Sequence, residues 1–379
     1  MSRAVYLDHN AGAPARPEVA AAVAEALLHG GNPSSIHASG RAARQRIEQA
    51  RAQVAALVEA DPAGVIFTSG GTEANALVLA GCGRIIRMAS AVEHPSVLDA
   101  GIDRIIPVDG NGIVDLAALD AMLAAESGLA LVSLMLANNE TGIIQPVAEA
   151  AALCHARGAL FHCDAAQAVG RMKLSIRYFN ADFLTLSAHK MGGPSGVGAV
   201  VMADPEFRMA PILLGGGQER RRRAGTENLS GIVGFGTAAA LAGDDLSGGD
   251  TISEICGLRD RLEREAARMV PEARVIGQAV ARLPNTTCLA LPGLAGQTQV
   301  MALDLAGVAV SAGAACSSGK VTESRVLAAM GLEPEIRGSA IRISMGRDTR
   351  SEDVDCFLAA WAELARRKGY TVNGAAAAA

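Results

Sequence analysis

Hydrophobic residues recur along the chain with two spacings that alternate. Helical spacing, with apolar positions three or four residues apart, predicts helices over 17–28, 42–58 and 147–156. Short apolar, β-branched runs predict strands. These runs cover 65–68, 84–88, 129–135, 159–163, 183–186 and 197–201. Strands that alternate with helices are typical of an α/β protein, with a doubly wound, mostly parallel sheet covered on both faces.

The pattern changes near residue 228. Two longer helices are predicted over 229–241 and 252–269, and the Gly/Asp/Ser stretch 243–251 between them is predicted to be a surface loop. Short strands and helices follow. We therefore predict a large domain over 16–260, and a smaller α+β domain formed by 1–15 together with 261–379.

Composition narrows the function classes. The 379 residues are 50% hydrophobic, enough for sizeable cores, and the net charge of −5 argues against a nucleic-acid partner held by a basic face. The longest apolar runs are too short to span a membrane, and Met1–Asp8 lacks an apolar signal core, so a cytoplasmic protein is expected. The seven cysteines are scattered without a CxxC pair, which argues against a disulfide scaffold or a structural zinc site.

Candidate chemistry lies where the predicted strands end, because ligands of such sheets bind beyond the carboxyl ends of the strands. Gly70, Gly71 and Thr72 follow the strand 65–68 and open a helix. Free backbone N–H groups and a hydroxyl at a helix start can bind an anion such as phosphate. An ordinary β–α turn is the alternative interpretation, and it is favoured if the motif stands alone.

Two further strand ends carry ionisable groups. Asp164 follows the strand 159–163 with Gln167 three residues on, and Lys190 follows the strand 183–186 just before Gly192. Asp164 could cap the next helix, and a lone lysine is usually solvated. A phosphate cradle, a carboxylate for a ring nitrogen and a lysine at a strand end are also the three parts that pyridoxal phosphate (PLP) requires.

Three other side chains are candidates. His94 follows the strand 84–88 and could stack on a pyridine ring and move protons, or be structural. Cys316 lies among Gly, Ala and Ser residues and could be a nucleophile once its thiol is activated. Arg342, in a strand-like run, could bind a substrate carboxylate or form a structural salt bridge. Histidines and cysteines at 154–155 and 162–163 are not expected to converge on a metal, because strand side chains alternate faces.

Together these segments resemble the NifS/IscS-type cysteine desulfurases, which belong to the class V aminotransferase fold. The resemblance covers nearly the whole chain. The matching segments are Tyr6–Asn10, Gly31–Ser35, Gly70–Asn75, Glu93–Pro95, Asn138–Gly142, Asp164–Gln167, Ser187–Lys190, Gly215–Arg220, Ala224–Asn228, Cys316–Gly319 and Arg342–Ser344.

The resemblance implies the PLP-dependent aminotransferase-like fold (fold type I) and a role for each residue. Lys190 would carry PLP, Asp164 would hold its ring nitrogen and His94 would stack on its ring. The remaining implied contacts are Gln167 and Asn139 to the ring oxygen, Gly71, Thr72, Ser187 and His189 to the phosphate, Thr226 to the phosphate from the second subunit of a homodimer, and Asn32 and Arg342 to the substrate carboxylate. Cys316 would accept sulfur, as in long-loop members.

The implied reaction converts L-cysteine to L-alanine and leaves a persulfide on Cys316 for an acceptor protein in iron–sulfur cluster or related sulfur assembly. A selenocysteine lyase or another class V PLP-dependent lyase or aminotransferase would use the same cofactor residues without Cys316. The chain departs from the family at Ala11, Gly12 and Ala13, near the expected substrate entrance, and at Ala188 and Ser195. Arg221 also stands where a glycine is frequent.

Overall fold

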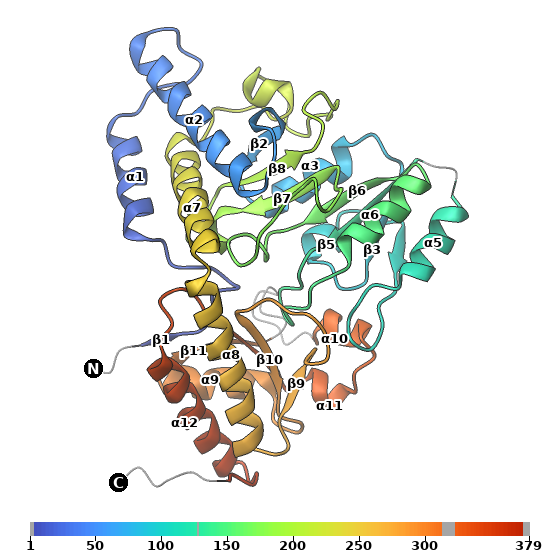
Figure 1. Cartoon of the computed structure of the whole chain (residues 1–379), viewed down its shortest axis with the longest axis vertical. Helices are drawn as coiled ribbons and strands as arrows, with labels where there is room; N and C mark the ends of the chain where they lie inside the picture. Colours follow the sequence, from blue (N-terminus) through green and yellow to red (C-terminus); the bar gives the residue numbers. More distant parts are fainter. Residues whose placement is uncertain (1–3, 127–128, 313–322, 374–379) are drawn as a thin grey trace.

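The structure is a computed structural model that describes residues 4–126, 129–312 and 323–373. Two layered units stack along the long axis of the molecule, each built around its own sheet (Figure 1). Among the described residues, no helix has the length and apolarity that crossing a bilayer requires.

The larger unit contains a sheet of seven described strands in the order β2-β8-β7-β6-β5-β3-β4. The strands are β2 (Val65–Thr68), β3 (Ile86–Ser90), β4 (Arg104–Ile106), β5 (Ala130–Met135), β6 (Leu160–Asp164), β7 (Phe183–Ser187) and β8 (Gly198–Met202). Five of them, from β7 through β4, are parallel, and β8 runs antiparallel to both its neighbours. β2 consequently points the same way as β7. The predicted mostly parallel α/β sheet is confirmed.

Helices cover both faces of this sheet because its strands are apolar on both sides. Adjacent residues of β2 belong to opposite cores: Phe67 lies in the core that contains residues of α2, α6 and α7, whereas Ile66 lies in the core that contains residues of α3. The helices of this unit are α1 (Pro17–Leu28), α2 (Ala38–Leu57), α3 (Gly71–Gly81), α4 (Pro95–Leu98), α5 (Leu116–Ala124), α6 (Val147–Ala156) and α7 (Leu229–Gly248). The helix predicted over 42–58 begins four residues earlier than predicted, at Ala38, with His37 as its N-cap.

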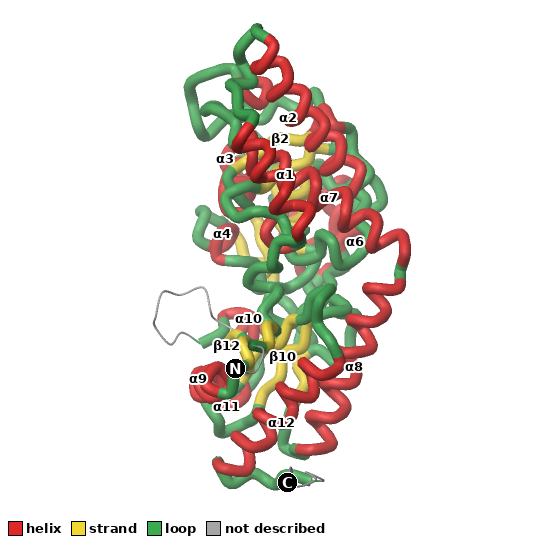
Figure 2. Tube along the Cα trace, turned by 90° about the vertical axis from the view of Figure 1, so that its left-hand side faces the viewer, coloured by secondary structure: helices red, strands yellow, loops and turns green. Residues whose placement is uncertain are grey.

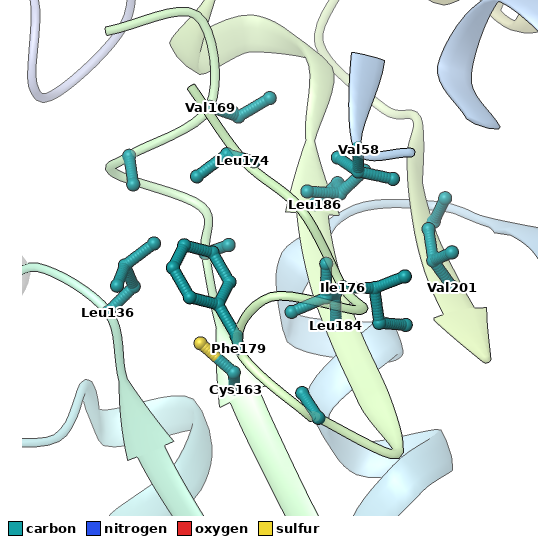
Figure 3. Packing of buried hydrophobic residues seen from close by; sticks show 14 of the residues in the cluster. Val58, Leu136, Cys163, Val169, Leu174, Ile176, Phe179, Leu184, Leu186 and Val201 are labelled. Atoms are coloured by element: carbon teal, nitrogen blue, oxygen red, sulfur yellow. The ribbon is translucent and has the colours of Figure 1, made fainter. Parts of the chain in front are cut away.

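The segment between β6 and β7 closes one face of the sheet. Figure 3 shows Leu174, Ile176 and Phe179 of this segment packed with Cys163 of β6 and Leu184 of β7. All five side chains are buried. Since Cys163 points into this core, its neighbours in β6, His162 and Asp164, point to the opposite face.

The smaller unit contains an antiparallel sheet in the order β12-β13-β10-β9 and a parallel pair, β1-β11. Its strands are β1 (Val5–Tyr6), β9 (Arg274–Ile276), β10 (Thr286–Ala290), β11 (Val308–Ala309), β12 (Ser311–Ala312) and β13 (Ala340–Ser344). Its helices are α8 (Asp250–Met269), α9 (Gly296–Leu305), α10 (Arg325–Ala329), α11 (Pro334–Arg337) and α12 (Ser351–Arg367). Phe357 and Trp361 of α12 anchor its core, and the Trp361 Nε1–H donates to Gln299 Oε1 at 2.9 Å.

The prediction of a loop over 243–251 is wrong. α7 continues to Gly248 and α8 begins at Asp250, so that only Gly249 separates the two helices, with a positive φ of 79° that glycine adopts readily. Asp245 forms an ion pair with Arg16, which holds this polar end of α7 in place. The two helices form a continuous column joining the units, visible in gold in Figure 1 and along one side of the molecule in Figure 2.

The division into domains at 16–260 and at 1–15 with 261–379 stays a prediction. β1 contributes Val5 to the core of the smaller unit, although it lies at the start of the chain. Ile255 of α8 joins the same core.

Candidate active site

The carboxyl ends of β2, β3, β5, β6 and β7 meet at one edge of the large sheet, facing the smaller unit. A cavity of about 360 Å³ lies there, within the size range of small-molecule sites. Ten of the residues singled out from the sequence line it: Gly71, Thr72, His94, Asn139, Asp164, Gln167, Ser187, His189, Lys190 and Arg342. Residues from α3, β6, β7 and β13, and from turns beside other strands, are thus brought into one site.

One end of the cavity is the N-terminus of α3. Gly71 and Thr72 begin this helix, and the N-cap Gly70 has no side chain to occupy the free N–H groups of the first turn. Gly198 of β8 permits this geometry, because a Cβ there would lie 2.7 Å from the carbonyl carbon of Gly70. The uncapped helix start, with its partial positive charge, suits an anionic group such as phosphate.

Asp164 lies deeper in the cavity, at the end of β6. The residue is 8% exposed, and each carboxylate oxygen accepts one hydrogen bond: Oδ2 from Asn75 Nδ2 at 2.8 Å and Oδ1 from the Ala166 N–H at 2.9 Å. Two donors hold the carboxylate in place while further lone pairs remain available. This arrangement suits a protonated ring nitrogen.

Lys190 enters the cavity from the turn after β7. Its Nζ donates to the carbonyl oxygens of Asn10 at 2.5 Å and Ala11 at 3.1 Å. The backbone beneath is also held, because the buried Arg171 donates to the Lys190 carbonyl and, at 2.5 Å, to Gln167 Oε1. Burial lowers the pKa of Arg171 to about 9.

Two histidines line the same cavity. Burial is the main cause that lowers the pKa of His94, and the positive charge of Lys190 adds to it, while Asp164 opposes the change. Burial, followed by the charges of Lys190 and Arg171, lowers the pKa of His189 to about 4. His189 Nδ1 lies 3.0 Å from Ser187 Oγ. Both rings are therefore neutral at pH 7.

Arg342 reaches the cavity from β13 of the smaller unit, and its side chain is 5% exposed. Its Nη2 donates to Asp8 and its Nη1 to the carbonyl of Asn139. Asn139 belongs to the larger unit and Arg342 to the smaller one, so they meet only because the two units pack together. The cavity thus lies between the large sheet and the small one.

Two predicted residues that the structure describes do not line this cavity. Asn32 lies in the loop between α1 and α2, where its Oδ1 accepts from the Ser34 N–H at 2.9 Å. Thr226 is exposed and lines a separate small cavity with Arg223 and Glu219. Cys316 lies outside the described residues.

The histidines and cysteines near residue 160 do not converge. His162 has both ring nitrogens within hydrogen-bond distance of hydroxyls, Ser133 Oγ at 2.8 Å and Thr185 Oγ1 at 3.0 Å. His155 pairs with Asp182 at 2.9 Å instead. Within the described part of the chain, no three His, Cys, Asp or Glu side chains come together as a metal site.

Several site residues are not individual candidates in the sequence. Asn10, Asn75 and Ser96 line the cavity, and Asp8 and Arg171 hold residues that do. Asp8, Asn10 and Asn75 stand inside the motif segments quoted above, so their position in a motif is the available signal. Nothing in the local sequence marks Ser96 or Arg171.

The aminotransferase class-V family matches residues 5–357. The chain belongs to this family. It is 44% identical to the cysteine desulfurase of Cereibacter sphaeroides over 93% of this chain and 94% of that one. It is 41% identical to the cysteine desulfurase of Klebsiella pneumoniae, over 94% and 91% of the two chains. The X-ray structure of a NifS-like protein from Rickettsia africae superposes with a TM-score of 0.89 at 35% identity, covering 96% of this chain and all of that one.

These likenesses confirm the predicted family, fold and enzyme class: a PLP-dependent cysteine desulfurase of the class V aminotransferase fold. The described residues fit PLP. An uncapped helix N-terminus, a buried carboxylate and a lysine amine face one cavity of suitable size, and the Asn75 Oδ1 is buried there without a partner among the described residues.

Proposed function

We propose that this class V enzyme removes the sulfur of L-cysteine, releases L-alanine and retains the sulfur on Cys316 as a persulfide. One observation carries the proposal. A single cavity joins the helix start at Gly71, the carboxylate of Asp164 and the amine of Lys190 to the guanidinium of Arg342. The first three suit PLP, and the fourth suits the carboxylate of an amino-acid substrate.

The cofactor would be held by residues at the strand ends. Asp164 would pair with the ring nitrogen, His94 would lie against the ring and Lys190 would bind PLP covalently. The phosphate would lie at Gly71, Thr72, Ser187 and His189, and the ring oxygen at Gln167 and Asn139. PLP supplies an electron sink that stabilises negative charge at the substrate Cα.

Side chains of the protein then carry out the separate steps of the reaction. Arg342 binds the substrate carboxylate and so orients the amino acid. Lys190 accepts the α-proton at Nζ. The Cys316 thiolate attacks the substrate sulfur; the Cβ–S bond breaks, its electron pair stays with Cβ, and Cβ takes up a proton to give alanine. We propose that the persulfide sulfur then passes to an acceptor protein.

The test is the Cys316→Ala variant, with Cys356→Ala as the matched control because Cys356 is an exposed thiol on α12. Cys316→Ala should fold and bind PLP, since the cavity residues are unchanged, but alanine release should fall by several orders of magnitude. Mass spectrometry of the wild type after brief exposure to L-cysteine should find one added sulfur on the peptide containing residue 316. Near-normal alanine release by Cys316→Ala would overturn the proposal in favour of a selenocysteine lyase or a generic PLP lyase.

We further propose a homodimer in which Thr226 completes the phosphate site of the other subunit. Support comes from its location: Thr226 is exposed and lies away from the cavity of its own chain. A Thr226→Asp subunit would repel phosphate in its partner's site, and a Lys190→Ala subunit is inactive in its own.

Mixing the two inactive variants tests the shared site. A mixed dimer contains one site with Lys190 and Thr226 both intact, so activity should reappear at up to about a quarter of the wild-type level on statistical exchange. If each site uses Thr226 of its own chain, the mixture stays inactive. Sedimentation as a fully active monomer would also contradict the proposal.

A further inference from the structure

Hydrogen bonds connect Asp164 to His94 through two residues that have no role in the scheme above. Asn75 Nδ2 lies 2.8 Å from Asp164 Oδ2 and 2.9 Å from Ser96 Oγ. Ser96 Oγ lies 2.8 Å from His94 Nδ1. All four residues line the cavity, and Asn75 is 1% exposed.

The direction of each hydrogen bond in this series follows from which atoms can donate and which can accept. The Asn75 amide must turn its NH₂ group toward Asp164, because the opposite orientation would place two oxygens against each other. Its second hydrogen points to Ser96 Oγ, which accepts it. The Ser96 hydroxyl hydrogen is then available to His94 Nδ1.

A second donor reaches the same ring nitrogen. The backbone N–H of Ser96 lies 3.1 Å from His94 Nδ1, at the start of α4, where His94 is the N-cap. Since two donors face Nδ1, this nitrogen must present its lone pair. The single ring proton of neutral His94 is therefore on Nε2.

We infer that Ser96 and Asn75 are positioning residues that hold His94 as the neutral Nε2–H tautomer and link its ring to Asp164. In this form His94 offers the cavity an N–H donor at Nε2 and has no lone pair there to accept a proton. Removal of the substrate α-proton is left to Lys190. His94 contacts and orients the bound ring, and it does not act as a base.

The charges around the ring agree with a neutral form. The charged groups that act on His94 are Asp164, Lys190 and Asp99. Burial and Lys190 lower the pKa of the ring, and the two carboxylates oppose this. Protonation at Nδ1 would also require the Ser96 hydroxyl to turn away and two N–H groups to face each other, which opposes the charged form further.

The tautomer can be read directly from ¹⁵N NMR of the holoenzyme labelled at histidine. The chain has seven histidines, and His94→Gln identifies the signals of His94 by their loss. We expect a proton-bearing Nε2 and a proton-free Nδ1 across neutral pH. A proton on Nδ1, or an imidazolium at pH 7, would overturn the inference without any variant.

Variants of Ser96 test the link itself. Ser96→Ala removes the hydroxyl donor but keeps the backbone one, so the pKa of His94 should rise by about one pH unit. Ser96→Thr keeps a hydroxyl and should restore the wild-type value, and Ser247→Ala, whose hydroxyl bonds only the Gly243 carbonyl among the hydrogen bonds described, is the control. An unchanged pKa in Ser96→Ala would contradict the link.

This inference rests on the proposed function only in taking the cavity as the PLP site. Its readout is the protonation of a ring, whereas the proposed function is read from alanine release and the sulfur on Cys316. Asn75→Leu should raise the His94 pKa in the same direction as Ser96→Ala, since Ser96 Oγ then lacks the donor that orients it. A fall in the pKa of His94 in Asn75→Leu would count against this hydrogen-bonded link.

Discussion

Asp8 and Arg342 form a partly buried ion pair beside the cavity, although 334 positions separate them in the sequence. Arg342 Nη2 donates to Asp8 Oδ1 at 2.7 Å, and Asp8 Oδ2 accepts from Ser311 Oγ at 2.9 Å. The guanidinium proposed to bind the substrate carboxylate therefore already has a carboxylate partner. Its Nε is buried and has no hydrogen-bond partner among the described residues.

Asp8→Asn should separate the effect of this ion pair on stability from its effect on substrate binding. The amide keeps an acceptor for Nη2 but loses its charge, so unfolding should require about 2 kcal/mol less free energy. An incoming carboxylate no longer meets a second carboxylate, so the KM for L-cysteine should fall about tenfold at low salt.

Urea unfolding and steady-state kinetics check the two parts. Asp355→Asn is the control, because Asp355 pairs with Arg261 on the surface and is 61% exposed. A higher KM in Asp8→Asn would mean that Asp8 orients Arg342 more than it competes with substrate.

Lys190→Ala should abolish both the visible absorption of bound PLP and alanine formation. The reason is that the amine held between the Asn10 and Ala11 carbonyls is the proposed covalent anchor. Absorption spectra of the purified variant check this, with Lys173→Ala as control because Lys173 is exposed and outside the cavity. A wild-type spectrum in Lys190→Ala would refute the assignment.

Glu140 should make the stability of the enzyme depend on pH. Its Oε2 accepts from Ser324 Oγ at 2.5 Å, and burial raises its pKa to about 7, against the opposing effects of Ser324 and Arg342. A carboxyl group whose pKa is raised on folding contributes most below its unfolded pKa of about 4.5, and this contribution is lost as the pH rises through 7.

Glu140→Gln should remove that loss, which amounts to about 3 kcal/mol. The free energy of unfolding of the variant, relative to wild type, should therefore rise between pH 5 and pH 8. Urea unfolding at both pH values measures it, and Glu363→Gln, a change at an exposed side chain, should show no such trend. A constant difference would mean that Glu140 titrates normally.

Arg221→Gly should stabilise the protein. Glu219, Arg220 and Arg221 have φ values of 43°, 55° and 65°, a left-handed conformation that L-residues adopt at a cost. Arg221 is exposed, and glycine removes the strain, so the free energy of unfolding should increase by about 1 kcal/mol.

Thermal or urea unfolding of Arg221→Gly checks the gain. Arg220→Gly is an instructive comparison: it relieves similar strain but loses the bond from Arg220 Nη1 to the Ala63 carbonyl at 2.7 Å, so its gain should be smaller. The unusual arginine at 221 is thus placed where a glycine fits the backbone. A loss of stability in Arg221→Gly would show that Arg221 makes a compensating contact.

The apolar pattern of the chain is sufficient to predict the larger sheet. The strand predicted over 65–68 and the helices over 17–28 and 147–156 have those same bounds in the structure, because strand and helix periodicities are local properties. The polar residues Asp164 and Lys190 can be assigned to one site from the sequence alone, since parallel strands end at the same edge of a sheet. The prediction of a loop over 243–251 fails because polar and glycine residues do not break a helix when Asp245 finds a partner in Arg16.

The partners of the site residues were decided only by the tertiary structure. Arg342 is predicted to bind either a substrate carboxylate or a salt-bridge partner, and the packing of β13 beside the start of the chain places Asp8 against it. Likewise, Ser96 and Asn75 bond to each other from separate helices. A side chain's type determines what it can donate or accept, and so the sequence by itself determined which chemistry was possible at each strand end. Which donor meets which acceptor depends on distances of about 3 Å between distant segments, and those exist only after the two units have packed together.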